Sequence, residues 1–396
     1  MSNPVEKAKS VVGGEAGAEL KAGAGGASSV HYDRPLSDFS IKVVQEDSAF
    51  KAGKILSNFN SKHRQDMFYF YEPAYFMINQ VKERAEGTEA AKAKYGVSRK
   101  PYATKVYALK QPVTDETVAN ADKPIDRIYE DATAFVVRQF LLHKEQVFAA
   151  SVLKGGGTWS TEWTGQDAAI TSGNGIVAGA KFQQFHKPTS KPLDVLDEAM
   201  ETIQLKSGLR PNTMVMTRQV FTALKRNSTI KTTKLYTNPN SASDDAVLDT
   251  IASHLGLSPS RIFVLDAVQQ GTGKIAAVDT TANSDANSVN NGILTIDTDA
   301  EGYGEKSSAT VAGTFIGGKG ILLMHVDPNS NGMYSATAAV CCQWTGLYPE
   351  GGEMGNVVFK RYRKEEYSAE FIEGRTAFEY KIVAPALGAF LADVIA

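Results

Sequence analysis

The longest regular pattern of apolar positions lies between residues 126 and 153. Ala132, Val136 and Phe140 recur at intervals of four and Val147 follows seven residues later, a spacing that places side chains on one face of an α-helix. No glycine or proline interrupts the segment before Gly155. It therefore predicts a helix of roughly 42 Å, at about 1.5 Å per residue. We call this segment the spine helix and these four residues its predicted packing face.

A second region, residues 188–354, alternates between helical and strand patterns. An amphipathic segment follows Pro192 and ends at Gly208, and a helix that Asp244 can cap ends at Gly256. Short apolar runs at 213–216, 262–265, 320–326 and 338–344 predict strands. This alternation is typical of α/β or α+β domains.

Three other segments predict extended chain. Residues 102–109 alternate in polarity, as a strand does, and residues 356–383 are extended and heavily charged. Residues 65–80 hold six aromatic side chains around Pro73, which forbids a regular helix through their middle. They predict strand, bend and extended chain, either as a core strand pair or as an apolar surface that meets another subunit.

Composition excludes several classes of protein. Of 396 residues, 42 are Lys or Arg and 44 are Asp or Glu, for a net charge of −2, whereas domains that bind duplex DNA by neutralising phosphates are usually strongly basic. The two cysteines, Cys341 and Cys342, are adjacent and offer no disulfide framework. No apolar run reaches the length of a membrane span, and we expect no secretory signal. Residues 1–30 are rich in Gly, Ala and Ser and predict a flexible tail.

Charge is unevenly distributed along the chain. Residues 81–110 hold eight bases and three acids, a balance of +5, whereas residues 241–310 hold ten acids and three bases, a balance of −7. The candidate contact residues of the basic block are Lys82, Arg84, Lys92, Lys94, Arg99, Lys100 and Lys105. Those of the acidic block are Asp244, Asp245, Asp297, Asp299 and Glu301.

The sequence offers no pattern for catalysis or for binding a cofactor. It contains neither the H-E-x-x-H spacing of zinc enzymes nor the G-x-S-x-G turn of serine hydrolases. The acids at 297–305 imitate a calcium loop, but Ser308 stands where a bidentate Glu is needed. We therefore expect no catalytic, metal-binding or cofactor-binding residues.

The order of these segments resembles that of tailed-phage major capsid proteins with the Hong Kong 97-like fold. The stretch Lys82 to Asp126 resembles their extended loop, Asp131 to Val152 resembles the start and body of their spine helix, and Gly208 to Ile230 resembles the start of their axial domain. The resemblance spans about residues 45–396 and implies an α+β fold. Its predicted parts are a tail (1–30), an N-terminal arm (31–80), an extended loop (81–122), a peripheral domain with the spine helix (123–187), an axial domain (188–354) with an insertion (271–318), long peripheral strands (355–383) and a C-terminal return to the axial domain (384–396).

This resemblance implies a shell protein, whose copies form pentamers and hexamers around packaged double-stranded DNA without sequence-specific contact. It places the chain in the virion capsid, assembled in the bacterial cytoplasm, with scaffold, portal and decoration proteins as further candidate partners. We hypothesise that the basic loop of one subunit lies over acidic surface of its neighbour. The alternatives are the shell of an encapsulin-type nanocompartment, a soluble two-domain α/β enzyme and a surface-displayed binding protein, and particle formation discriminates the shells from the rest.

Overall fold

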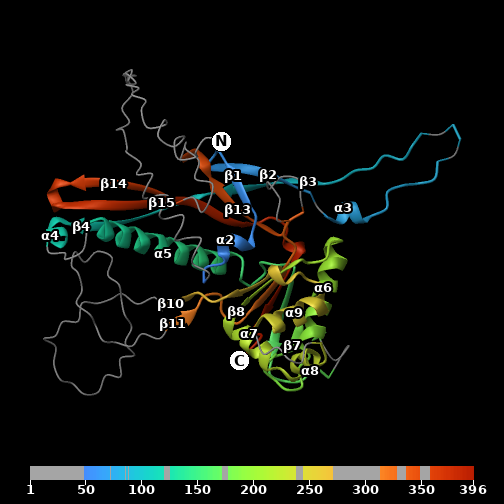
Figure 1. Cartoon of the computed structure of the whole chain (residues 1–396). Coiled ribbons are helices and arrows are strands. Elements are labelled where there is room, and N and C mark those ends of the chain that lie inside the picture. The colour runs from blue at the N-terminus through green and yellow to red at the C-terminus, as the bar shows by residue number, and fades with distance from the viewer. Residues whose placement is uncertain are drawn as a thin grey trace, which may run out of the picture. The chain divides into compact units, whose positions relative to one another are not determined.

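The computed structural model describes residues 49–396 except 72, 85, 88, 120–124, 172–176, 238–243, 271–312, 328–335 and 348–356. All described residues belong to one compact unit of the chain, residues 32–396. The predicted tail (1–30), most of the predicted insertion (271–318) and most of the acidic block lie outside the described residues. The unit contains two large sheets, a long helix and a hairpin with a long connection (Figure 1).

The long helix α5 spans Ile125–Ser151 and matches the predicted spine helix. It packs on a five-stranded sheet formed by β1 (Asn58–Ser61), β13 (Ala339–Trp344), β15 (Ala369–Ile382), β14 (Val358–Lys364) and β4 (Lys105–Thr114). The 14-residue strand β15 is central to this sheet. It pairs with β4 along one edge, and with β14 and then β13 along the other. The strand β1 adds to β13 in parallel, and the other pairs are antiparallel.

The second sheet has seven strands, in the order β6 (Val177–Ala178), β7 (Lys181–Gln183), β5 (Thr161–Gln166), β16 (Gly388–Ala392), β12 (Ile321–Met324), β8 (Thr213–Thr217) and β9 (Ile262–Leu265). Its helices are α6 (Pro192–Ser207), α7 (Arg218–Arg226), α8 (Ser228–Thr237) and α9 (Asp244–Leu255). The helix α6 ends, as predicted, at Gly208, whose φ of 76° is left-handed.

The central strands of this sheet are buried on both faces. Met214, Met216 and Leu323 pack with the core of α6, α7 and α9. Val215 and Leu322 point the other way and pack with Phe148 and Leu153, at and just beyond the end of the spine helix. Because successive side chains of a strand face opposite sides, these strands read as continuous apolar runs rather than as alternating ones.

The remaining elements are short. They are α2 (Ala52–Ile55), α3 (Pro73–Met77), α4 (Asp115–Ala119), the strand pair β10 (Val268–Gln270) and β11 (Gly313–Phe315), and the 3-10 turns Pro259–Arg261, Thr345–Leu347, Glu365–Tyr367 and Pro385–Leu387. The hairpin consists of β2 (Gln65–Tyr71) and β3 (Val97–Ala103), paired antiparallel.

Two sequence expectations differ from the structure. The chain after Tyr71 is not extended, because Pro73 begins the helix α3, and a proline at the first helical position loses no hydrogen bond. The alternating stretch 102–109 is not one strand. It is split at Thr104, whose backbone N–H donates to Arg64 O, so that β3 joins the hairpin and β4 joins the five-stranded sheet.

Candidate assembly surfaces

The hairpin β2–β3 has one packed face and one exposed face. Phe68, Phe70 and Tyr102 pack against residues of the five-stranded sheet, including Val340 and Cys342. On the other face, the exposed side chains are those of Met67, Tyr69 and Tyr71. Both sequence readings of this aromatic segment therefore describe part of it, because one face is core and the other is an apolar surface.

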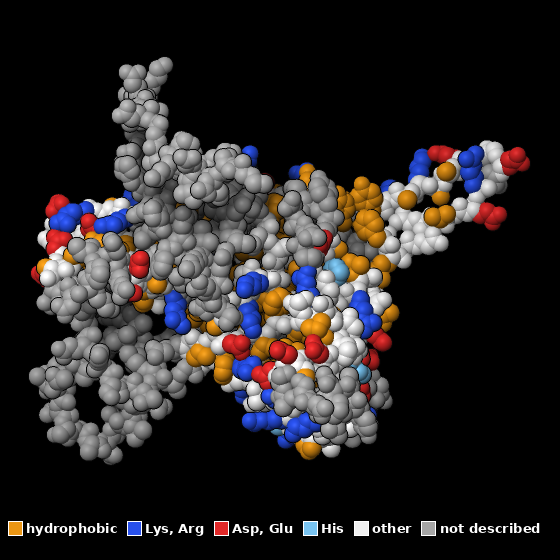
Figure 2. All heavy atoms as spheres, in the orientation of Figure 1, with side chains coloured by type: hydrophobic (Ala, Val, Ile, Leu, Met, Phe, Trp, Pro, Cys, Tyr) orange, Lys and Arg blue, Asp and Glu red, His pale blue; other side chains and the backbone are white. Residues whose placement is uncertain are grey.

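Apolar side chains also gather where the long connection leaves the hairpin. Tyr71, Phe76 and Tyr95 lie with ring centroids 6.0–6.4 Å apart. We define the loop-base patch as these three residues with Tyr75, Met77, Ile78 and Val97, all of which are exposed. Figure 2 shows hydrophobic side chains gathered at this end of the hairpin and charged side chains of both signs toward the tip of the connection. Exposed apolar groups in such a cluster are typical of a surface that meets a partner.

The connection between β2 and β3, residues 72–96, is electrically balanced. It holds four bases, Lys82, Arg84, Lys92 and Lys94, and four acids, Glu72, Glu83, Glu86 and Glu89, for a net charge of zero. The Lys92 Nζ lies 3.2 Å from Glu89 Oε1. The surplus of positive charge in residues 81–110 comes mainly from strand residues, so the connection itself is not a basic surface.

The other predicted loop cations lie in strands. Arg99 stacks on the Tyr69 ring at 5.1 Å and donates to Tyr69 Oη at 3.1 Å. Lys100 Nζ lies 3.8 Å from the Phe70 ring centroid and donates to Val383 O. Lys105 is exposed at the start of β4, opposite Phe378 of β15. Arg99 and Lys100 therefore have contacts within the chain.

The predicted packing face of the spine helix lies toward the five-stranded sheet. Val136 and Phe140 are buried among Phe359 and Ile372, Ala132 lies at the margin of the same cluster, and Val147 lies beside the next one. Sequence reasoning missed Glu145 on this helix, which is 1% exposed. A signal was present, because Glu145 follows Leu141 by four residues and continues the apolar stripe of Val137 and Leu141.

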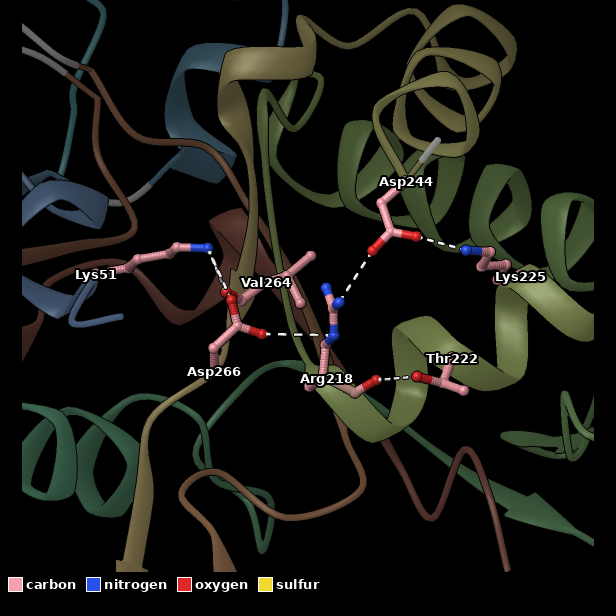
Figure 3. Close-up of polar contacts among 7 residues, drawn as sticks. All are labelled: Lys51, Arg218, Thr222, Lys225, Asp244, Val264 and Asp266. Carbon is pink, nitrogen blue, oxygen red and sulfur yellow. Dashed lines mark hydrogen bonds and ion pairs between the residues drawn. The ribbon is translucent and has the colours of Figure 1, made fainter. Parts of the chain in front are cut away.

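A network of ion pairs connects Lys51, close to the first described residue, with the second sheet and its helices (Figure 3). Lys51 Nζ donates to Val264 O at 2.8 Å and lies 3.3 Å from Asp266 Oδ2. Arg218 pairs with both carboxylates: its Nε lies 3.8 Å from Asp266 Oδ1, and its Nη2 lies 2.9 Å from Asp244 Oδ2. Lys225 Nζ also pairs with Asp244, at 2.6 Å from Oδ1. The hydrogen bond from Lys225, together with Arg218, holds the pKa of Asp244 below its usual value.

This network shows that part of the acidic block has partners within its own chain. Asp244 and Asp266, which belong to the acidic block, are engaged with cations of their own chain. Asp245 is exposed in the first turn of α9. Asp297, Asp299 and Glu301 lie outside the described residues.

Burial shifts the pKa of several titratable side chains among the described residues. Burial raises the pKa of the Cys341 thiol to about 11 and that of Cys342 to about 12, so both stay protonated and unreactive at neutral pH. Burial also lowers the pKa of His143, whose ring packs on Tyr107. Among the described residues, no three His, Cys, Asp or Glu side chains form a potential metal site. No helix in the same part of the chain combines the length and the apolar character of a membrane span.

The chain is similar to several solved structures. A phage-related protein from Bordetella bronchiseptica matches with a TM-score of 0.60 and 14% identity, over 93% of this chain and 99% of that chain. The mature capsid of bacteriophage PhiM1 matches with a TM-score of 0.46 and 11% identity, over 95% and 92% of the two chains. The capsid of the cyanophage P-SCSP1u matches with a TM-score of 0.45 and 10% identity, over 99% and 95%. No protein-family model and no curated protein sequence matches the chain.

The match to the phage-related protein shows a common fold. At the level of the fold, the sequence prediction of a Hong Kong 97-like α+β architecture is confirmed. The described residues supply its parts: a hairpin with a long connection, a spine helix on long strands, and a second mixed sheet with its own helices.

Proposed function

We propose that this chain is a major capsid protein, copies of which assemble as pentamers and hexamers into the icosahedral head shell of a tailed phage around double-stranded DNA. The observation that carries the proposal is the shared fold with a phage-related protein over nearly the whole of both chains. The role is structural rather than enzymatic. The site of action is the virion capsid, after assembly in the host cytoplasm, with scaffold, portal and decoration proteins as further partners.

The loop-base patch supports the proposal physically. A shell protein needs self-complementary surfaces whose contacts close into a cage. Phe76 and Ile78 are 66% and 62% exposed, and complete burial of one such side chain against a neighbouring copy contributes about 1.5–3 kcal/mol. Exposed ion pairs contribute only about 0–1 kcal/mol each. We therefore assign most of the binding energy between neighbouring copies to the loop-base patch. The charged residues of the connection then determine how the two copies align.

Electron microscopy and size-exclusion chromatography of the purified chain test the proposal. Closed icosahedral particles or capsomers are expected, and a uniform monomer or small oligomer would contradict a shell. Particles made in bacteria that enclose a protein cargo instead of DNA would favour the encapsulin-type alternative.

Two sets of variants separate apolar from charged contacts. Phe76→Ser with Ile78→Ser should abolish particles while the chain remains folded, whereas the matched control Phe76→Leu with Ile78→Leu should still assemble. Lys82→Glu with Arg84→Glu and Lys94→Glu should slow assembly and change its dependence on salt. If the serine variant assembles at the normal rate, the loop-base patch is not a subunit contact.

A further inference from the structure

The carboxylate of Glu145 is buried against the start of α2. Its Oε1 accepts hydrogen bonds from the backbone N–H groups of Lys51 and of Ala52, the second at 2.6 Å. Its Oε2 is buried and has no hydrogen-bond partner among the described residues. Because a buried carboxylate with an unsatisfied oxygen is costly, this contact holds α2 at the expense of a poorly solvated charge.

The surroundings of Glu145 do not neutralise that charge directly. The titratable groups that face it are Lys51, which immediately precedes α2, and Tyr380 on β15. Lys51 directs its ammonium group away, to Val264 O and Asp266. Burial raises the pKa of Glu145, and the two backbone N–H groups and the charge of Lys51 offset this only in part.

The segment held by Glu145 connects three parts of the fold. Ala52, Ile55 and Leu56 pack in one cluster with Phe148 of the spine helix and with residues of both large sheets. Through Lys51, the same segment is tied to β9 and to Asp266, which directly follows that strand. Release of α2 from Glu145 would therefore loosen the contact of the chain's N-terminal side with the spine helix and with the second sheet together.

We propose that Glu145 is a pH-sensitive latch for residues 51–56, which is tighter when the carboxylate takes up a proton as the pH falls and weaker when the carboxylate is charged. A protonated carboxyl group keeps a carbonyl oxygen that accepts from Lys51 N and Ala52 N, and it loses the cost of a buried charge. This inference does not depend on the proposed function, because it concerns a contact within one chain.

The sign follows from linkage between protonation and conformation. In the open state Glu145 is solvated and has its ordinary pKa of about 4.5, and in the closed state its pKa is higher. A group that binds protons more tightly in the closed state favours closure as the pH falls. The closed state is therefore fully favoured below the ordinary pKa, and the advantage is lost as the pH rises through the closed-state pKa.

Hydrogen–deuterium exchange of residues 50–56 in the full-length chain tests the latch. After correction for the intrinsic exchange rate, protection should fall as the pH rises from the ordinary pKa of about 4.5 through the closed-state pKa. The fall should be about tenfold for each unit by which the closed-state pKa exceeds the open-state pKa. Glu145→Gln, which keeps the acceptor oxygen without the charge, should make protection independent of pH and at least equal to that of the wild type at pH 8. Glu145→Ala should lose protection at every pH.

Two controls make the result specific. Asp266→Asn removes the other carboxylate beside Lys51 and should keep the wild-type dependence on pH. A peptide within α6, residues 193–203, reports on global stability in every variant. The wild-type series needs no substitution, so a protection at residues 50–56 that is constant from about pH 4 to about pH 8 would overturn the proposal even if a variant failed to fold. A Glu145→Gln variant that folds and keeps the wild-type slope would overturn it as well.

Discussion

The guanidinium of Arg363 forms a two-pronged ion pair with the carboxylate of Asp115. The Nη1 atom lies 3.0 Å from Oδ1, and Nη2 lies 2.7 Å from Oδ2. Asp115 begins α4, directly after β4, and Arg363 lies near the end of β14. Since β4 and β14 lie on opposite edges of β15, this pair ties together the two edges of the five-stranded sheet at its end.

Asp115→Asn should loosen the turn at Glu365–Tyr367 that follows β14. The hydrogen bonds from Arg363 hold the pKa of Asp115 below its ordinary value of 3.8. The stabilisation is therefore present above pH 3.8 and is lost as the pH falls through the lowered pKa. Limited proteolysis with a glutamate-specific protease should cleave after Glu365 and Glu366 faster in this variant at pH 7. Glu116→Gln, at the exposed neighbouring position, should leave the rate unchanged, and equal rates in both variants would argue against the pair.

Phe140→Ala should destabilise the chain far more than Phe135→Ala. Phe140 is 4% exposed in the core beneath the spine helix, whereas Phe135 on the same helix is 49% exposed. Removal of a buried phenyl ring costs about 3–5 kcal/mol, and a surface substitution usually changes stability by no more than about 0.5 kcal/mol. Urea unfolding of the unassembled chain measures both. Similar losses in the two variants would mean that the helix is not packed as described.

Gly374→Ala should also destabilise the chain, through crowding rather than a cavity. A Cβ at this position of β15 would lie 2.6 Å from Phe140 Cε2, 3.0 Å from Val136 Cγ1 and 3.1 Å from Phe359 Cε1. Overpacking of this kind costs about 1–3 kcal/mol. The matched control is Gly53→Ala in α2, where no heavy atom lies within 4 Å of the added Cβ, and it should be neutral or stabilising by up to about 1 kcal/mol. Thermal unfolding measures the stability of both variants. A Gly374→Ala variant as stable as the wild type would contradict the close packing of Phe140, Val136 and Phe359 around this glycine.

Cys341 and Cys342 should not react with thiol reagents in the folded chain. With the pKa of Cys341 raised to about 11, about one thiol in a thousand is ionised at pH 8, and the thiolate is the reactive form. Both residues are also buried in β13. Titration with a chromogenic aromatic disulfide reagent at pH 8 should release no coloured thiolate until urea is added. After unfolding it should release two equivalents per chain. Rapid release without urea would show that β13 opens readily.

The elements with strong local periodicity were predictable from the sequence. The spine helix and the helices ending at Gly208 and Gly256 carry apolar stripes and glycine stops that depend on nearby residues alone. The match of α5 to the predicted segment follows from this local signal.

Partners in a sheet were not predictable in the same way. The alternation of residues 102–109 indicates strand, but β3 pairs with the nearby β2 while β4 pairs with β15, close to the other end of the chain. Hydrophobic periodicity specifies a face and not a neighbour. That pairing also separates the basic residues of this region. Arg99 and Lys100 lie in β3 and stack on aromatic rings of β2, whereas Lys94 lies in the connection.

The ion pairs within the chain could not be predicted from the sequence either. Asp244 was assigned to an acidic surface because net charge was counted along a block of sequence. Arg218 and Lys225, which neutralise it, lie outside that block and meet it only in the folded chain. The contact of Glu145 with α2 could not be predicted for the same reason, because its hydrogen-bond donors lie 93 and 94 residues away in the sequence.

The position of β16 makes closure of the second sheet depend on residues 388–392. This strand comes from residues 388–392, yet it lies between β5 and β12 in the middle of the seven-stranded sheet. Until β16 is in place, no strand pairs with both β5 and β12 among the described residues. The second sheet is therefore joined only after every other one of its strands has been synthesised, because β5, β6, β7, β8, β9 and β12 all precede β16 along the chain.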